Sequence, residues 1–130
     1  MPQFDDAITT DAPPEEVWKL LYDTSRFPDW WEGVETAENR DGGVTIYPDG
    51  YPDFPMPQDI HSSRDAGRVQ ISCLVSDIRF EWRLAVENGP PTRTRISVAV
   101  EIPEEEAHRL QRQREVASAS LRKLAELATR

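Results

Sequence analysis

The stretch ITTDAPPEEVWKLLYDTSRFPDWW, residues 8–31, decides how the chain folds, because its periodicity changes partway along. It starts at the end of a short alternating segment, residues 4–10, which predicts a first strand. Between residues 11–23 the apolar spacing is helical, so that Val17 and Leu21 share one face. Prolines stand at the start of this segment and glutamates follow in its first turn, as at the beginning of many helices. We therefore expect a strand followed directly by a short helix.

The second half of this stretch predicts another, shorter helix with two neighbouring tryptophans near its end. Thr24 or Ser25 is the expected N-terminal cap, and Pro28 opposes a long continuation. Adjacent residues on a helix point about 100° apart, so Trp30 and Trp31 should not face the same interior. We expect Trp30 in the core and Trp31 partly exposed, where it could contact a cavity or a partner.

The middle of the chain predicts an antiparallel meander. Turn signals such as Asp41-Gly42-Gly43 and Asp65-Ala66-Gly67 separate short runs in which apolar and polar residues alternate. The apolar positions of three such runs are Val69, Ile71, Cys73 and Val75; Ile78, Phe80, Trp82, Leu84 and Val86; and Ile96, Val98 and Val100. Strands with one dry and one wet face belong to a sheet that is covered on one side only.

The final segment, from Pro103 to about Thr129, predicts a long helix that covers the dry face. Its apolar stripe consists of Leu110, Ala117, Leu121, Leu124 and Ala128. The expected fold is α+β in a single domain, residues 1–130: a curved antiparallel sheet of about seven strands wrapped on a long C-terminal helix, with two short helices between strands 1 and 2. The first strand should pair at an edge, beside the last strand.

Composition and charge exclude several function classes. Acidic residues outnumber basic residues 24 to 15, and a formal charge of -9 opposes binding to nucleic acid. No stretch approaches the ~20 apolar residues of a membrane span, so we expect no stable membrane insertion and a cytoplasmic location. Metal-ligand spacing and glycine-rich phosphate loops are missing, and we expect no metal and no cofactor. The expected state is a monomer or a homodimer.

Two segments carry a resemblance to a known superfamily. Residues 8–31 resemble the opening of the helix-grip superfamily, often called SRPBCC, with its strand, its Ala-Pro-x-Glu-x-Val-Trp helix and a turn leading to a tryptophan. SLRKLAELA, residues 120–128, resembles the end of that superfamily's long helix. The superfamily includes START lipid-transfer domains, the birch-pollen allergen and polyketide cyclase/dehydrase proteins.

The resemblance implies an apolar cavity between the sheet and the C-terminal helix. Its mouth would be framed by residues 48–57, Ser76-Asp77 and Ile102-Pro103. The expected ligand is a hydrophobic small molecule, lipid or polyketide-like. The side chains expected to contact it are Trp31, Tyr47, Tyr51, Phe54, Ile71, Cys73, Phe80, Trp82, Ile96, Val98, Leu110, Arg114 and Ala117. The loop 48–57 alternates prolines with aromatic residues and is either a stiff surface loop or a lid.

Tyr47, His61 and Arg114 are weak catalytic candidates. His61 could act as a general base, although its neighbour Ile60 is the apolar member of the strand and would turn His61 to solvent. Arg114 could bind a ligand carboxylate, or its long side chain could extend past the sheet edge into water.

Three functions remain open on the sequence. A carrier of a hydrophobic molecule is preferred, and it requires a cavity of at least ~300 Å³, the usual lower size for a ligand pocket. The alternatives are a polyketide cyclase or dehydratase that uses polar cavity residues, and a partner-binding domain that uses the aromatic loop.

Overall fold

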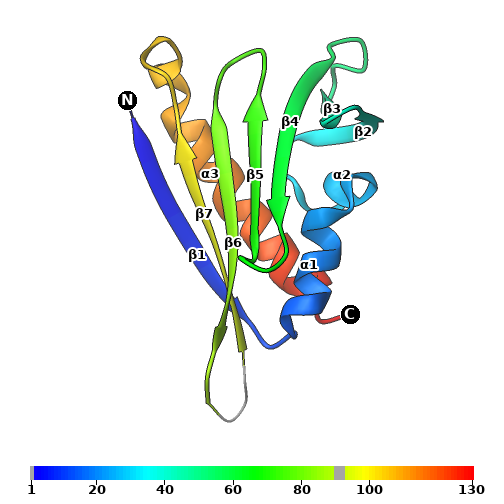
Figure 1. Ribbon diagram of the computed structural model, residues 1–130. Helices are drawn as coiled ribbons and strands as arrows, with labels where there is room; N and C mark the ends of the chain where they lie inside the picture. The colour runs from blue at the N-terminus through cyan, green and yellow to red at the C-terminus, as the bar shows by residue number, and fades with distance from the viewer. Residues whose placement is uncertain (1, 90–92) are drawn as a thin grey trace.

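The computed structural model describes residues 2–89 and 93–130, and its helices and strands follow the predicted order (Figure 1). The elements are β1 (Gln3–Thr10), α1 (Pro14–Tyr22), η1 (Thr24–Arg26), α2 (Phe27–Trp30), β2 (Val34–Arg40), β3 (Gly43–Pro48), β4 (Met56–Ser63), β5 (Arg68–Cys73), β6 (Arg79–Glu87), β7 (Arg93–Glu101), η2 (Glu104–Arg109) and α3 (Leu110–Leu127). The η elements are 3-10 helices. The predicted α+β helix-grip architecture is confirmed.

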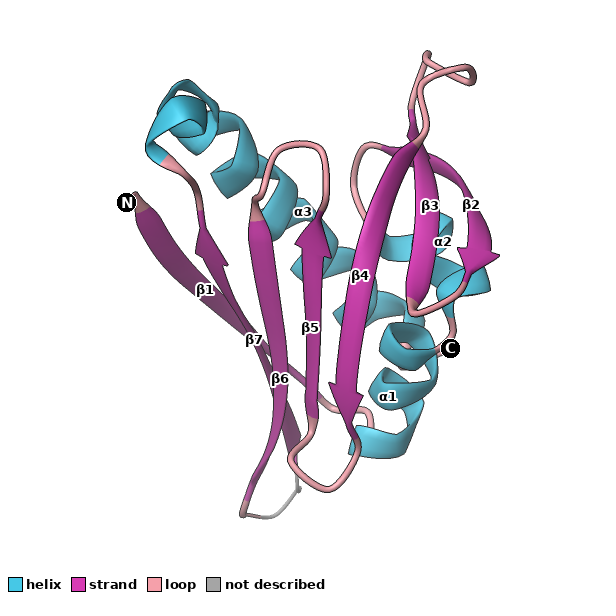
Figure 2. Ribbon diagram, turned by 45° about the horizontal axis from the view of Figure 1, so that its top comes forward, coloured by secondary structure: helices cyan, strands magenta, loops and turns pink. Residues whose placement is uncertain are grey.

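The strands of this described part form one antiparallel sheet of seven, in the order β1-β7-β6-β5-β4-β3-β2. β1 pairs along β7, with Phe4 opposite Val100 and Ile8 opposite Ile96, so the prediction that the first strand joins the last at an edge is confirmed. Helix α3 crosses one face of the curved sheet, and α1 and α2 lie beside β4, β3 and β2 (Figures 1 and 2). The sheet and α3 therefore enclose a common interior.

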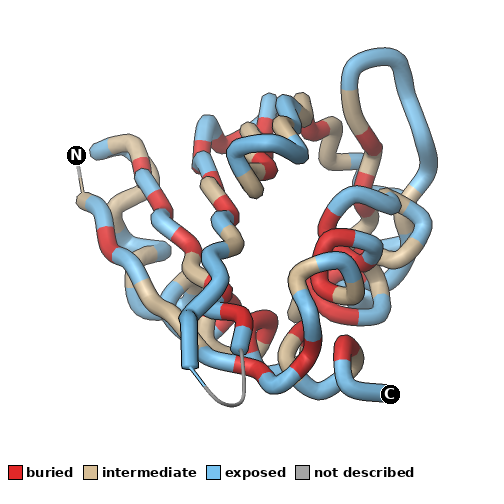
Figure 3. The backbone as a smooth tube through the Cα atoms, turned by 60° about the horizontal axis from the view of Figure 1, so that its bottom comes forward, coloured by how far each residue is buried: buried red, intermediate tan, exposed pale blue. Residues whose placement is uncertain are grey.

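Burial follows the alternation expected of a sheet with one covered face. Along β7 the even-numbered positions are buried, and Ile96, Val98 and Val100 are at most 1% exposed. Figure 3 shows the same change between buried and exposed positions along the tube. From the helix side, α3 contributes Ala117 and Leu121, as predicted. The core is therefore made by the inward faces of the strands and the stripe of α3.

The C-terminal helix differs from the prediction at its start. Glu104–Arg109 is a 3-10 helix in which no residue is buried, and the α-helix begins only at Leu110. Packing therefore does not require α-helical spacing there, and short 3-10 segments are frequent at helix ends. The buried stripe also includes Val116 and Ser120, which the predicted stripe omitted.

Two strand positions predicted to be buried are exposed. Val75 is 54% exposed, because β5 ends at Cys73 and the chain turns through Asp77, whose φ is 60°. Val86 is 50% exposed. The pairing of β5 with β6 reaches only to Arg83, so Val86 has a strand neighbour on one side alone.

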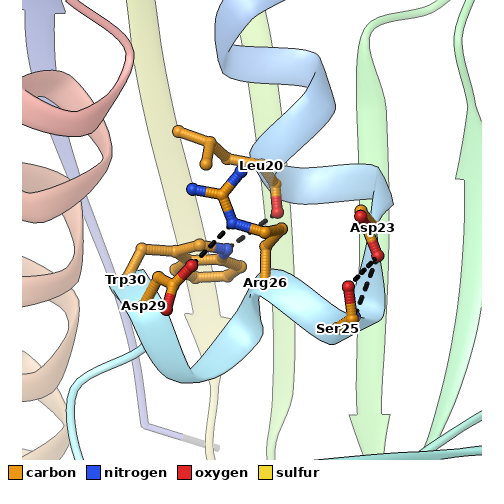
Figure 4. A network of polar contacts seen from close by, with 6 residues as sticks. All are labelled: Leu20, Asp23, Ser25, Arg26, Asp29 and Trp30. Carbon is orange, nitrogen blue, oxygen red and sulfur yellow. Dashed lines mark hydrogen bonds and ion pairs between the residues drawn. The ribbon is translucent and has the colours of Figure 1, made fainter. Parts of the chain in front are cut away.

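A third difference concerns the cap between the two short helices. The cap of η1 is Asp23, not Thr24 or Ser25. The Oδ1 atom of Asp23 accepts hydrogen bonds from the backbone N–H of Ser25 at 3.0 Å and from its hydroxyl at 2.6 Å (Figure 4). A carboxylate that receives two donors is a strong cap, and it fixes the direction in which the next turn leaves α1.

That next turn brings Trp30 back under α1. The indole N–H of Trp30 donates to the carbonyl oxygen of Leu20 at 2.8 Å, and Arg26 pairs with Asp29 at 2.6 Å on the outer side of the same turn (Figure 4). The buried hydrogen bond anchors α2 to α1, so the position of Trp30 is fixed by the helix pair as well as by packing.

Candidate functional site: a groove between the sheet and helix α3

Both tryptophans of the Trp30-Trp31 pair are buried, which corrects the expectation that Trp31 is partly exposed. Trp30 is 0% exposed and Trp31 is 4% exposed. The 100° spacing does not apply, because α2 ends at Trp30 and Trp31 has the extended angles φ -82° and ψ 109°. The two rings are stacked, with centroids 5.9 Å apart and an interplanar angle of 9°.

The pair joins a five-ring aromatic cluster on the inner face of β6. Trp30 meets Trp82 edge to face at 5.0 Å, and Trp31 meets Phe80 in the same way at 5.5 Å. Phe27 contacts both tryptophans. Phe80 and Trp82 are two residues apart on one strand, so they share a face. Consecutive tryptophans thus pack on consecutive inward positions of the same strand.

Beyond Trp31 and Phe80 the interface between the sheet and α3 opens into a groove of about 250 Å³. The groove is framed by the start of β2, the facing ends of β3 and β4, the β5–β6 turn, and the η2–α3 junction. Its wall consists of Trp31, Glu32, Gly33, Val34, Ile46, Pro48, Met56, Gln58, Cys73, Ser76, Ile78, Phe80, Arg109, Arg112, Gln113 and Val116. Larger hollows lie on the outside of the molecule, for example beside Trp18 and Tyr22, whereas this groove is bordered by the buried side chains of Trp31, Phe80 and Val116.

The groove wall contains one buried polar side chain that is not fully hydrogen-bonded. Gln58 is 1% exposed; its Nε2 donates to the carbonyl oxygen of Met56 at 3.2 Å, but among the described residues its Oε1 accepts nothing. Cys73 lies directly opposite Gln58 in the β4–β5 pairing, so the thiol and the amide occupy the same face. Ser76 is 8% exposed, and its Oγ accepts a hydrogen bond from the N–H of Ile78 at 3.4 Å. The amide, the thiol and the hydroxyl are the polar groups that the strands and the β5–β6 turn contribute to the wall, and the other polar members are Glu32, Arg109, Arg112 and Gln113.

The rim of the groove carries charges that are already paired. Glu32 is paired with Lys123 of α3, and this contact lowers the pKa of the Glu32 carboxyl, with smaller contributions from nearby arginines. Arg109 lies 2.5 Å from a carboxylate oxygen of Glu106, and Arg112 lies 3.7 Å from Glu115. Because each cation has an acidic neighbour, the rim is not a strong anion site.

Glu32, the residue that follows Trp31, is bound to α3 by two contacts, which together form a clamp. The backbone N–H of Glu32 donates to Ser120 Oγ at 3.0 Å, and its side chain reaches Lys123 one turn further along. Ser120 is 0% exposed, and its buried hydroxyl oxygen accepts this hydrogen bond from Glu32. The clamp sets the separation of α2 and α3 at the edge of the groove.

Three of the predicted ligand contacts line the groove, namely Trp31, Cys73 and Phe80. Five others, Ile71, Trp82, Ile96, Val98 and Ala117, are buried outside it, in the closed part of the core. Leu110 is half-buried at the start of α3, and Tyr47, Tyr51 and Phe54 also lie outside the wall. Tyr51 and Phe54 are 64% and 52% exposed on the loop that protrudes beyond β3 and β4 (Figure 2).

The catalytic candidates Tyr47, His61 and Arg114 do not line the groove either. Tyr47 alternates with the buried Ile46, and His61 is exposed, as the position of Ile60 predicted. The guanidinium of Arg114 is exposed and lies 4.9 Å from the centre of the Phe4 ring, a cation–π contact at the sheet edge.

The sequence contained signals for groove residues that the prediction missed. Gln58 precedes the apolar Ile60 by two positions and therefore faces inward with it. On the helix, Arg109, Arg112, Gln113 and Val116 follow the spacing i, i+3, i+4 and i+7 of a single face. This face was overlooked because most of its members are polar.

The described part of the chain contains neither a cluster of metal-binding side chains nor a helix that could cross a membrane. Across residues 2–89 and 93–130, His, Cys, Asp and Glu side chains nowhere form a group of three or more that could hold a metal ion. No helix in the same ranges has both the length and the apolar character needed to cross a membrane.

The seven-stranded sheet wrapped on a long C-terminal helix is the helix-grip fold, and solved structures share this fold. The Zhui aromatase/cyclase from a Streptomyces species is similar, with a TM-score of 0.81 and 17% identity over 99% of this chain and 94% of that chain. The di-domain aromatase/cyclase BexL has a TM-score of 0.77 and 14% identity over 99% of this chain and 47% of that chain. The XoxI protein from Bacillus cereus has a TM-score of 0.74 and 16% identity over 97% and 94%.

At these identities the likeness shows the fold alone. A sequence profile of the family described as polyketide cyclase / dehydrase and lipid transport matches residues 1–129. The chain belongs to this family. Among curated proteins, none matches the sequence.

Proposed function

We propose that the protein binds a small, mainly apolar molecule in the groove between the sheet and α3. The observation that carries this proposal is the groove itself: about 250 Å³, bordered by Trp31 and Phe80 and by buried aliphatic side chains. Ligand sites in proteins are typically apolar clefts with a few polar groups that fix orientation. Membership of a family described by cyclisation, dehydration and lipid transport supports the same use of the interior.

The volume limits the size of the ligand. At about 250 Å³ the groove falls below the usual lower size of ~300 Å³ for ligand pockets. An apolar cavity of roughly 150 Å³ holds one benzene ring. The groove therefore suits one or two fused rings, or a short aliphatic chain, and a long lipid would need the 48–57 loop to move. The carrier proposal therefore applies to a ligand of about the size of two fused rings.

Catalysis of a polyketide cyclisation or dehydration remains the alternative, supported by the names of two structural neighbours. Under this alternative the polar groups that orient and polarise the substrate would be residues of the groove wall, such as Gln58, Ser76 and Arg109, rather than Tyr47, His61 and Arg114. Turnover of an aromatic-polyketide test substrate by the wild type, lost when a groove residue is replaced, would favour it over simple binding.

The partner-binding alternative is supported by the exposed side chains of Tyr51 and Phe54. If these residues dock on another copy of the chain, gel filtration and small-angle scattering will show a dimer that the double replacement by serine converts to a monomer. A monomer at all concentrations in both proteins would remove this support.

The binding proposal is tested by calorimetric titration of the purified protein with 2-methoxynaphthalene, after native mass spectrometry for a co-purified molecule. We expect one site per chain. Replacing Val116 by phenylalanine adds bulk to the groove wall from α3 and should weaken binding by about tenfold or more. Val86→Phe is the matched control, because Val86 is exposed and lies outside the groove.

Failure of naphthalene, 2-methoxynaphthalene and the hydroxylated probe 2-naphthol all to bind the wild type would overturn the proposal. Equal affinities in Val116→Phe and Val86→Phe would show binding at another place. Val86 borders a hollow on the outside of the molecule. If the probe binds in that hollow instead of the groove, Val86→Phe should weaken binding and Val116→Phe should not.

A further inference from the structure

We propose that the groove selects a ligand that carries a hydroxyl group, and that Gln58 Oε1 accepts the hydrogen bond of that hydroxyl. This inference rests on the proposed binding function and adds the chemistry that the ligand must present. It starts from one atom: a side-chain oxygen of a residue only 1% exposed that accepts nothing among the described residues.

The orientation of Gln58 is fixed by its neighbours. Its Nε2 donates to Met56 O at 3.2 Å, which leaves Oε1 as the free end of the amide. Its backbone carbonyl is 3.3 Å from an Arg40 guanidinium nitrogen, and the same guanidinium binds Asp59 at 3.0 Å. β4 is therefore held on both sides of Gln58, and the side chain lines the groove rather than solvent.

A buried acceptor without a donor is unfavourable, and most buried side-chain polar atoms in proteins have a partner. Trp82 Nε1 is also unpartnered within the described residues, but Trp82 is 0% exposed and no part of the groove wall. Arg68 Nε and Glu106 Oε2 lack a hydrogen bond among the same residues too, but neither residue is part of the groove wall, whereas Gln58 is. The comparison singles out Gln58 as the polar atom that binding would satisfy.

The oxygen atom Oε1 of Gln58 determines which chemical group the ligand must present to it. An amide oxygen cannot donate, so a ligand carbonyl or carboxylate would oppose it with lone pairs. A ligand ammonium could donate, but moving a charge into an apolar groove costs far more than moving a neutral hydroxyl. Ser76 also lines the groove, and because its Oγ accepts from the N–H of Ile78, its own O–H is the group that would donate to a ligand oxygen. A hydroxyl both donates and accepts, so it matches Gln58 and Ser76 together.

The test compares three probes of similar shape by calorimetry: 2-naphthol, 2-methoxynaphthalene and naphthalene. For the wild type we expect 2-naphthol to bind about tenfold more tightly than either of the others, the effect of leaving one buried acceptor unpaired. Naphthalene is smaller and 2-methoxynaphthalene is larger than 2-naphthol, so a preference over both cannot come from size.

Gln58→Met removes the acceptor and keeps the length of the side chain. We expect this variant to bind 2-methoxynaphthalene at least as well as the wild type, with its preference for 2-naphthol reduced to about twofold or less. Gln70→Met is the matched control, because Gln70 is half-buried on β5 outside the groove. Thermal unfolding of each variant confirms that it is folded.

Equal affinities of the wild type for 2-naphthol and 2-methoxynaphthalene would overturn the inference and leave the binding function intact. A preference that persists in Gln58→Met would also overturn it, because another group or a water molecule would then be the partner. Failure of all three probes to bind would instead contradict the proposed function. In a crystal structure with 2-naphthol, the ligand oxygen should lie about 2.7 to 2.8 Å from Gln58 Oε1.

Discussion

The interface between the sheet and α3 has a closed half and an open half, built from the same two elements. The closed half contains Trp30, Trp82, Ala117, Leu121 and Leu124, which are all at most 2% exposed and belong to one hydrophobic cluster. In the open half, Trp31 and Phe80 face a groove whose helix side is Arg109, Arg112, Gln113 and Val116. The strands supply apolar side chains to both halves. The difference lies in α3, whose inward face is apolar after Val116 and mostly polar before it.

This division shows how a small domain can keep an open groove without losing its core. Arginine and glutamine stems can line a groove while their polar ends stay at the rim, whereas leucine would extend inward and fill it. Stability should therefore depend on the closed half and ligand binding on the open half. Substitutions in the closed half should therefore mainly lower stability, and substitutions in the open half should mainly change ligand binding.

Trp30→Ala should be the most damaging change. It removes a ring that is 0% exposed, contacts three other aromatic rings and donates to Leu20. Loss of a buried tryptophan side chain costs about 3–5 kcal/mol, to which the orphaned carbonyl adds. Urea denaturation monitored by circular dichroism measures this. Trp30→Phe gives a milder companion if the alanine variant does not fold, and a loss below about 1 kcal/mol in both would contradict the assignment of Trp30 to the closed core.

Gly43→Ala tests the open half from the sheet side. A Cβ atom at Gly43 would lie 1.8 Å from the carbonyl oxygen of Gln58, so β3 and β4 would have to separate at their pairing. We expect a loss of about 1–3 kcal/mol, together with weaker probe binding because Gln58 moves. Gly42→Ala is the control, since its Cβ would meet nothing within 4 Å and only its φ of +75° opposes the change. Equal losses in the two variants would show that the close approach is unimportant.

Trp31→Ala should cost less stability than Trp30→Ala and change binding more. We expect a loss of about 2 kcal/mol, below the range for an enclosed ring, because one side of Trp31 already borders the groove. The removed ring enlarges the groove, so probes with three fused rings should bind more tightly than to the wild type. Calorimetric titration with anthracene measures this. A variant that loses as much stability as Trp30→Ala, with unchanged anthracene binding, would remove the distinction between the halves.

The residues of the closed half could be predicted from the sequence, whereas those of the open half could be predicted only in part. The alternation around Phe80 and Trp82 and the stripe through Ala117 and Leu121 report burial directly, since apolar residues at strand and helix spacing have few other uses. Trp31 was misplaced because the end of a four-residue helix depends on one residue's φ and ψ, which residue type does not set.

The groove itself depends on where side chains fail to meet, which periodicity does not report. Ile71, Ile96 and Val98 were predicted ligand contacts by the same inward pattern that identifies Phe80, yet only Phe80 of these borders open space. Gln58 is a polar residue, so the apolar pattern by itself does not mark it as a groove residue. The informative signal is that Gln58 lies two residues before Ile60 on the same strand, so both side chains point to the inner face of the sheet.

The smallest effect concerns the charged clamp at the rim. Pairing with Lys123 lowers the folded-state pKa of Glu32 below its ordinary value of 4.5, so the pair stabilises the protein above that pH. The contribution is lost as the pH falls through the lowered pKa. Because the Glu32 side chain is 33% exposed, solvent screening limits the gain, and Glu32→Gln should cost less than about 1 kcal/mol at pH 7.

The pH profile separates this clamp from simple loss of packing. The difference in unfolding free energy between wild type and Glu32→Gln should shrink below pH 4.5 and vanish once the wild-type carboxyl is protonated in both states. Urea titrations at pH 7, 5, 4 and 3 would measure it, with Glu38→Gln on the exposed part of β2 as the control. A difference that stayed constant across this range would mean that the carboxylate charge of Glu32 does not hold α2 against α3. The hydrogen bond from its backbone N–H to Ser120, present in both proteins, would then be the contact that sets the width of the groove.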